Sequence, residues 1–264
     1  MVAPVLSAFV SMAFAQVVPV ATPSSSDLAG TYLWQCNALH FPVACEITHE
    51  GLVAVADASG ELIGISAADG AIRWRTTKAG EEALVDPAGV AALPDGSLLV
   101  TDRRRGRVEH FSAQGVWIDR FAPEIALAAP TSIATGALIT REKCVAIVDE
   151  ARHEIVIASD DGKEIRRIAR DQLLMLDGSH ALPFHVAFVG VGLLAVSATE
   201  HHQIFILKLG DGTGDDRDGS IVQATWGGRG PFPGLFNQPA GIAADGSWLW
   251  IADQFNHRIA RQSH

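Results

Sequence analysis

The sequence is poor in the residues that stabilise or anchor several classes of protein. Its three cysteines are too few for a disulfide scaffold, and they lack the paired spacing of a zinc site. No run of 18 or more apolar residues lies in the mature region, so we expect no membrane-spanning segment. Lys and Arg number 20 against 30 Asp and Glu, a net charge of −10. This balance argues against nucleic acid as a partner, because affinity for a phosphate backbone comes mostly from basic side chains.

The chain nevertheless has ample material for a folded core. It has 264 residues, of which 48% are hydrophobic and 19% are charged, so intrinsic disorder is excluded. This length corresponds to one large domain or two small ones.

The amino terminus allows two interpretations. Residues 1–15 are uncharged and mostly apolar and end in small residues, which resembles a secretory signal without the usual basic residue. Alternatively, Phe9–Ala13 and Gln16–Ala21 are strands of a blade, one of the small β-sheets that the repeat described below predicts. We expect an export signal over 1–15, a domain over 16–264 and a secreted or extracytoplasmic protein, with a cytoplasmic location as the alternative. In an exported chain Cys36 and Cys45 are free to pair, and Cys144 is left over.

A repeat of 43 to 56 residues runs along the chain. Each unit begins with a proline and a short apolar strand, and the five prolines are Pro42, Pro87, Pro130, Pro183 and Pro239. A second apolar strand follows and ends in Asp57, Asp102, Asp149 or Asp253, whereas the fourth unit has Ala198 there. A third and a fourth strand come next, separated by polar turns such as Asp69-Gly70, which favour hairpins.

This pattern predicts an all-β fold, because the runs are of strand length and none has a helical period. Four antiparallel strands per unit at this spacing are typical of a β-propeller blade. We predict five blades near residues 41–84, 85–127, 128–180, 181–235 and 236–264, or six if residues 5–35 belong to another blade. The last unit supplies three strands, so we predict that residues 30–35 add the fourth and close the ring. The four Asp that end second strands are expected to accept hydrogen bonds from the backbone of their turns.

The last unit resembles an NHL repeat. It carries the proline segment from Phe236, an Asp-Gly turn, a strand ending in Ala252-Asp253, and then Asn256, His257, Arg258 and Ile259. The second unit, from Asp86 to Phe121, is also a good match. The resemblance implies an NHL-type β-propeller but says little about function, because one fold serves many activities.

Propeller enzymes offer an alternative with a divalent cation in the central channel. Amidating lyases of this family place a histidine directly after the first-strand proline, whereas here only His185 is near, offset by one residue. Lactonases use Glu, Asn and Asp on inner strands, and only Glu46 is in such a place. We therefore predict no catalytic or metal-binding residue and no cofactor, with calcium or zinc implied only by a lactonase-like hydrolase or an amidating-lyase-like enzyme.

One face of the predicted propeller gathers basic and histidine side chains. In an up-and-down blade, the turns from strand two to three and from four to one emerge on the same side; we call this the turn face. Loops on a rigid scaffold commonly carry binding residues. We predict a non-enzymatic, monomeric scaffold that binds a protein or a small anionic ligand there, and the candidate residues are Arg103, Arg104, Arg105, His153, His202, Asn256 and His257.

Overall fold

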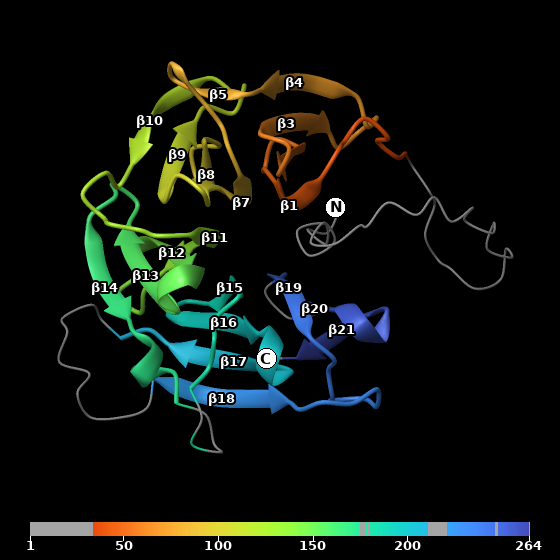
Figure 1. Ribbon diagram of the computed structural model, residues 1–264, viewed down its shortest axis with the longest axis vertical. Helices are drawn as coiled ribbons and strands as arrows, with labels where there is room; N and C mark the ends of the chain where they lie inside the picture. Colours follow the sequence, from red (N-terminus) through yellow and green to blue (C-terminus); the bar gives the residue numbers. More distant parts are fainter. Residues whose placement is uncertain (1–33, 175–177, 179, 211–220, 246–247, 264) are drawn as a thin grey trace, which may run out of the picture.

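Five β-sheets stand around a central axis in the computed structural model, as the blades of a propeller (Figure 1). The structure describes residues 34–263 except 175–177, 179, 211–220 and 246–247. The predicted all-β propeller with five blades is confirmed. The expected signal over 1–15 and the domain start at residue 16 lie outside the described residues.

Each of the first four blades is a four-stranded antiparallel meander. The first contains β1 (Pro42–Ile47), β2 (Leu52–Asp57), β3 (Glu61–Ser66) and β4 (Ile72–Thr76). The second contains β7 (Pro87–Ala92), β8 (Leu98–Asp102), β9 (Arg107–Phe111) and β10 (Trp117–Phe121). The third contains β11 (Pro130–Ala137), β12 (Lys143–Asp149), β13 (Glu154–Ser159) and β14 (Glu164–Ile168). The fourth contains β15 (His185–Gly190), β16 (Leu193–Ala198), β17 (Gln203–Lys208) and β18 (Val222–Gly227).

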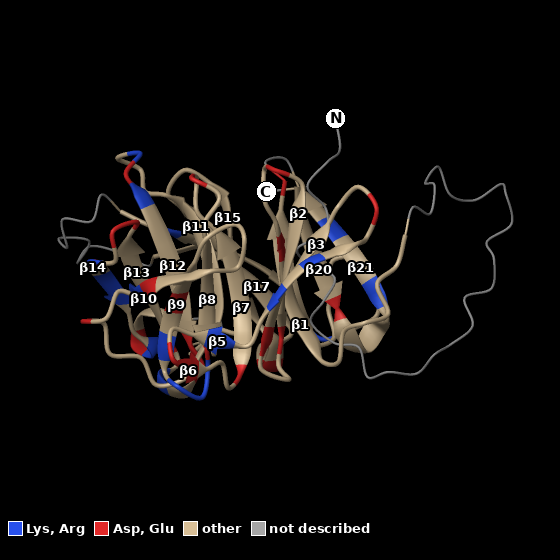
Figure 2. Cartoon of the chain, turned by 90° about the horizontal axis from the view of Figure 1, so that it is seen from above, with Lys and Arg blue, Asp and Glu red and all other residues tan. Residues whose placement is uncertain are grey.

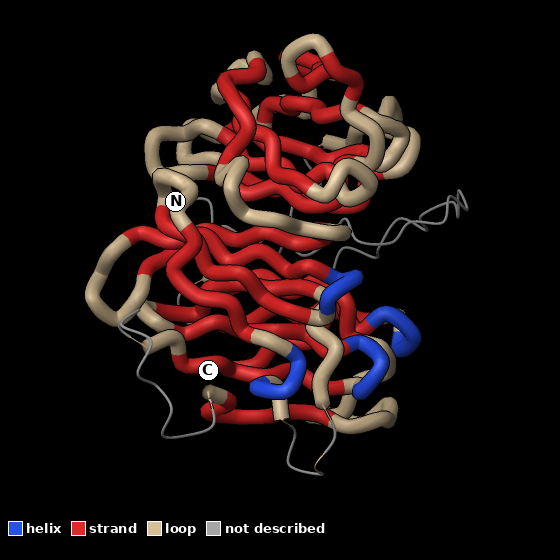
Figure 3. Tube along the Cα trace, turned by 60° about the vertical axis from the view of Figure 1, so that its left-hand side comes forward, coloured by secondary structure: helices blue, strands red, loops and turns tan. Residues whose placement is uncertain are grey.

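The fifth blade has three strands in the part of the chain that the structure describes: β19 (Pro239–Ala244), β20 (Trp248–Asp253) and β21 (Arg258–Ser263). A small hairpin of β5 (Lys78–Ala79) and β6 (Glu82–Ala83) lies between the first two blades. Four 3₁₀ turns complete the elements of the described residues: η1 (Glu150–Arg152), η2 (Arg170–Gln172), η3 (Thr199–His201) and η4 (Gln254–Asn256). Figure 3 shows the helical turns gathered on one side of the molecule. None of the described helices is long and apolar enough to cross a membrane.

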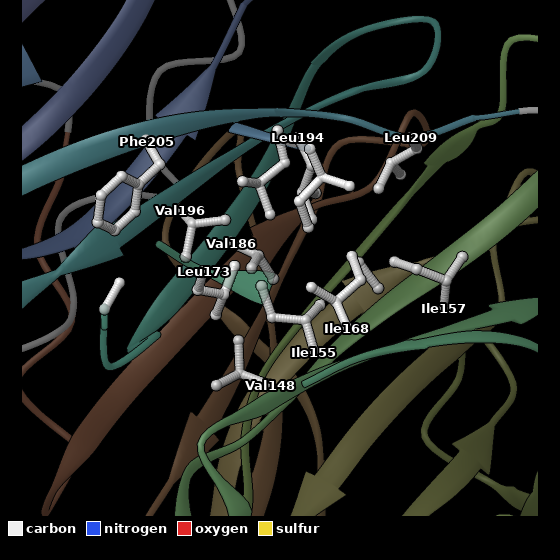
Figure 4. Close-up of a cluster of buried hydrophobic side chains, with 14 of the residues drawn as sticks. Val148, Ile155, Ile157, Ile168, Leu173, Val186, Leu194, Val196, Phe205 and Leu209 are labelled. Atoms are coloured by element: carbon white, nitrogen blue, oxygen red, sulfur yellow. The ribbon is translucent and has the colours of Figure 1, made fainter. Parts of the chain in front are cut away.

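The cores lie between neighbouring blades, because each sheet buries both faces. Between the third and fourth blades, Ile155 and Ile168 pack with Leu194 and Phe205, all fully buried (Figure 4). Burial of one such side chain contributes about 1.5–3 kcal/mol. Side-chain hydrogen bonds also join neighbouring inner strands; one runs from the Thr135 hydroxyl to the Ala92 carbonyl over 2.9 Å.

The aspartates that end the second strands are structural, as predicted, and they accept hydrogen bonds both from their own turns and from the segment that enters the blade. Asp57 accepts hydrogen bonds from the backbone amides of His40 and Phe41, at 2.8 and 2.9 Å, and from Ser59. Burial alone would raise the pKa of Asp57, but the hydrogen bonds from these three residues outweigh it and lower the pKa. Each such carboxylate therefore fastens the segment that enters its own blade to the second strand.

The predicted closing strand over residues 30–35 is not found among the described residues. Residues 30–33 lie outside them, and Trp34 and Gln35 are in no strand. The Trp34 indole instead donates to the Ala67 carbonyl of the first blade, over 2.8 Å, and lies against Gly70. This contact with the first blade partly buries the indole and satisfies its N–H. Cys36, Cys45 and Cys144, all among the described residues, form no disulfide with one another.

Candidate functional site

The inner strands of all five blades line one cavity on the propeller axis. These strands are β1, β7, β11, β15 and β19, and the cavity has a volume of about 140 Å³. Each inner strand is the edge of its sheet. An edge strand leaves backbone N–H and C=O groups unpaired on its free side, so the wall offers both donors and acceptors. We call this cavity the channel.

Strand pairing identifies equivalent positions in the five inner strands. In each blade, one inner-strand residue pairs with the second-strand residue that lies three positions before the end of the second strand. These inner-strand residues are Glu46, Ala91, Ala134, Ala187 and Ala243. Alanine suits this position because the inner strands approach one another closely at the axis. Glu46 is therefore a carboxylate at a level where the other four blades have a methyl group.

The Glu46 side chain has no charged or hydrogen-bonded partner among the described residues. Burial between the inner strands raises the pKa of Glu46 to about 7. The neighbouring thiol of Cys45 stays protonated, because burial, with a further effect from the Glu46 charge, raises its pKa to about 12. A carboxyl group with a pKa near 7 can accept or release a proton at neutral pH.

His185 is the second ionisable group of note in the channel. It opens β15, and its Nδ1 atom is buried without a hydrogen-bond partner in the part of the chain that the structure covers. Burial lowers the pKa of His185 to about 4, against a weaker opposing effect of the Val186 backbone. The imidazole is therefore neutral at physiological pH. The sequence had offered His185 only as a displaced member of a metal-binding pattern.

The channel does not fit a divalent metal ion. A protein-bound zinc or calcium ion needs several nitrogen, sulfur or oxygen ligands converging on one point. No group of three or more His, Cys, Asp or Glu side chains with that arrangement occurs among the residues described. Glu46 and His185 come from the first and fourth blades, and both neighbouring strands of Glu46 carry apolar residues at its level.

The arginines of the turn face are engaged with carboxylates of the same protein. Arg103 donates to Asp86 over 2.8 Å, and Arg105 pairs with Glu82 of the β5–β6 hairpin. Arg104 is the exposed member of the three, with 74% of its side chain accessible, and lies 3.7 Å from Asp86. Figure 2 shows basic and acidic residues side by side along the edge of the molecule where β5 and β6 lie.

The other predicted residues of the turn face shape the turns. His153, His202 and His257 follow η1, η3 and η4 in the left-handed backbone region, with φ of 54°, 58° and 52°. His202 Nδ1 accepts a hydrogen bond from the Gln238 amide. Asn256 donates to the Gly230 carbonyl and to Asp253.

No hydrogen bond or ion pair among the described residues joins the predicted turn-face residues of different blades. The same face carries exposed aromatic side chains, since Phe41, Phe232 and Phe255 are 67%, 68% and 52% accessible. Recognition of a protein or of a small anion at this face stays a prediction.

The comparisons with known proteins agree with this architecture. A family model for the NHL repeat matches residues 84–111, which is the second blade rather than the last unit. The virginiamycin B lyase of Staphylococcus aureus superposes with a TM-score of 0.58 at 16% identity over 85% of this chain. A catalytically inactive histidine variant of that lyase, solved with quinupristin, gives 0.59 at 16% identity over 85%, and a streptogramin B lyase gives 0.56 at 13% over 85%.

These identities show a shared fold and nothing finer. The chain spans 66% of the length of the staphylococcal lyase and 69% of the streptogramin B lyase. No curated protein matches the chain. The protein is a five-bladed β-propeller. More particularly, its second blade matches the NHL repeat over residues 84–111.

Proposed function

We propose that the protein binds a small molecule in its channel and that Glu46 gives this site its chemistry. The observation that carries the proposal is the carboxylate at a level where the four other blades have alanine. A partly buried carboxyl group without a hydrogen-bond or ion-pair partner among the described residues lowers the stability of a fold, so its presence calls for a compensating use. His185 adds a buried, unpaired nitrogen to the same wall.

A lyase acting through the same site is the second candidate. The fold is shared with a virginiamycin B lyase and a streptogramin B lyase, and the former is inactive when a histidine is replaced. A lyase that works by elimination needs a base to remove a proton, and a base works best with a pKa near the working pH. Glu46, with its pKa raised to about 7 by burial, meets this requirement.

Binding is tested with the alanine methyl groups of the channel as reporters. The protein is labelled with ¹³C at its alanine methyls and titrated with propylammonium, 1-propanol, propionate and quinupristin. We expect at least one probe to shift the resonances of Ala91, Ala134 and Ala187, which line the channel, and to leave Ala113 in the β9–β10 turn unchanged. The proposal is abandoned if none of the four probes moves a channel methyl.

The lyase candidate is tested with quinupristin alone. Incubation followed by liquid chromatography shows whether the compound is converted, and Glu46→Gln removes the proposed base. Glu61→Gln is the matched control, because Glu61 lies in the same blade but pairs with Arg75 outside the channel. Conversion that is lost in Glu46→Gln and kept in Glu61→Gln supports the lyase; conversion retained in Glu46→Gln excludes Glu46 as the base.

A protein partner at the turn face is compatible with this proposal. The inner strands begin on that face, so the turns surround one end of the channel. The exposed phenylalanines there are the residues that such a partner would cover.

A further inference from the structure

We infer that the ligand of the channel is a compact primary ammonium ion held by the Glu46 carboxylate. This inference rests on the proposed function and names the class of molecule that the same site takes. It is carried by three properties of the wall: its charge, its hydrogen-bonding groups and its size.

The charge of the wall favours a cation. The ionisable residues that line the channel are Cys45, Glu46 and His185, and no lysine or arginine is among them. β7, β11 and β19 contribute only uncharged residues, most of them apolar. The thiol is protonated and the imidazole is neutral near pH 7, since burial sets their pKa values at about 12 and 4. Glu46 is thus the single group of the lining that can carry a charge at that pH.

The hydrogen-bonding groups of the wall favour an ammonium ion over a metal ion. An ammonium group has three donors and is satisfied by one carboxylate together with one or two carbonyl oxygens. The free edges of the inner strands present such carbonyl groups. A divalent metal would need the converging side-chain ligands that the described residues do not provide.

The size of the channel favours a compact molecule. A volume of about 140 Å³ holds several water molecules or a short-chain molecule, whereas a large molecule such as quinupristin could enter it only in part. The alanines at the level of Glu46 leave room beside the carboxylate, and Val90, Ile133 and Ile242, one position earlier along each strand, also line the wall. A short alkyl chain with an ammonium head matches this arrangement.

Binding of such a cation is coupled to release of a proton. The cation binds the ionised form of Glu46, whereas burial keeps the carboxyl group largely protonated below pH 7. The apparent affinity is reduced by the ionised fraction, so it is about 100-fold weaker at pH 5 than at pH 8 for a pKa near 7.

Calorimetry with propylammonium tests the inference, because this ion is fully charged over the whole range. Titrations at pH 5, 6, 7 and 8, in buffers of different ionisation enthalpy, give both the affinity and the number of protons released. We expect the affinity to rise about 100-fold from pH 5 to pH 8, with close to one proton released at pH 5 and almost none at pH 8. An affinity that is unchanged between pH 5 and pH 8 overturns the inference.

Matched variants separate the role of Glu46 from a general effect of charge. Glu46→Gln keeps the shape of the side chain and should abolish binding, whereas Glu61→Gln removes one charge from the outside of the same blade and should bind as the parent does. Glu46→Ala is a second variant that is expected to fold, because four blades have alanine at this level. Equal binding by Glu46→Gln refutes the inference.

The same probes distinguish this inference from the proposed function. If 1-propanol or propionate shifts the channel methyls and propylammonium does not, the channel binds a small molecule of another class and only the inference fails. If no probe shifts them, both fail.

Discussion

Glu46 and His185 give the stability of this protein two opposing dependences on pH. Glu46 holds its proton in the folded state up to about pH 7, but an unfolded chain releases it near 4.5. The contribution of Glu46 to stability therefore falls as pH rises from 4.5 to 7. His185 has the opposite effect on stability. In the unfolded chain its imidazole binds a proton below pH 6.5, whereas in the folded state it stays neutral down to about pH 4. Its contribution is therefore lost as pH falls through this range.

The two effects are of similar size. Each pKa shift corresponds to up to about 3 kcal/mol, at about 1.4 kcal/mol per pH unit. Between pH 4.5 and 6.5 the slopes have opposite signs and cancel in the parent protein. Glu46→Gln should become more stable than the parent by an amount that grows from near zero at pH 4.5 to about 3 kcal/mol at pH 7. In His185→Gln the uncompensated Glu46 slope remains, so this variant should lose stability as pH rises from 4.5 to 7.

Urea denaturation followed by tryptophan fluorescence measures these differences between pH 4 and 8. Comparing each variant with the parent at the same pH removes the contribution of the surface carboxylates, which is common to both. Glu61→Gln is the control and should show no such growth with pH. A Glu46→Gln difference that is constant across the range would mean that Glu46 titrates normally, and the argument for the channel would lose its electrostatic basis.

Three further predictions concern the scaffold. Asp102→Ala should destabilise the protein by about 2–4 kcal/mol, because the buried backbone amides that this carboxylate satisfies lose their acceptor, and Asp102→Asn should cost less; urea denaturation measures both. Iodoacetamide at pH 8 should modify Cys36, which is partly exposed, well before Cys45, whose pKa burial raises to about 12; peptide mass spectrometry follows this, and equal rates would contradict it. Gly136→Ala should destabilise by about 1–3 kcal/mol, since an added methyl group would meet the Phe188 ring, and an unchanged denaturation midpoint would show that the ring can move aside.

Most of the strand arrangement could be predicted from the sequence. The second strands in particular match closely, as at Leu52–Asp57, Leu98–Asp102 and Leu193–Ala198. These segments are apolar on both faces and end where the backbone must turn, so local sequence alone defines them. The position of Trp34 was predicted wrongly, because a tryptophan beside a strand-like run does not reveal which blade it covers.

The turn face shows a second limit of sequence reasoning. The consecutive arginines from Arg103 were correctly placed in a turn, but their partners Asp86 and Glu82 lie about 20 residues away in the chain. Only the fold brings these carboxylates to the arginines. The β5–β6 hairpin that carries Glu82 is too short to show as a strand pattern.

The channel could have been found by aligning the five units on the end of the second strand. A residue that recurs in each unit at such a position serves the scaffold, as the aspartates and the alanines do. A residue that differs from its equivalents in the other units is not explained by the scaffold and needs a separate explanation. Glu46 and His185 are two such departures on the inner strands, and both raise the free energy of the fold at some pH within the range 4 to 7. Because selection on stability alone would favour an alanine at the level of Glu46, the carboxylate is better explained by a ligand that meets it in the channel.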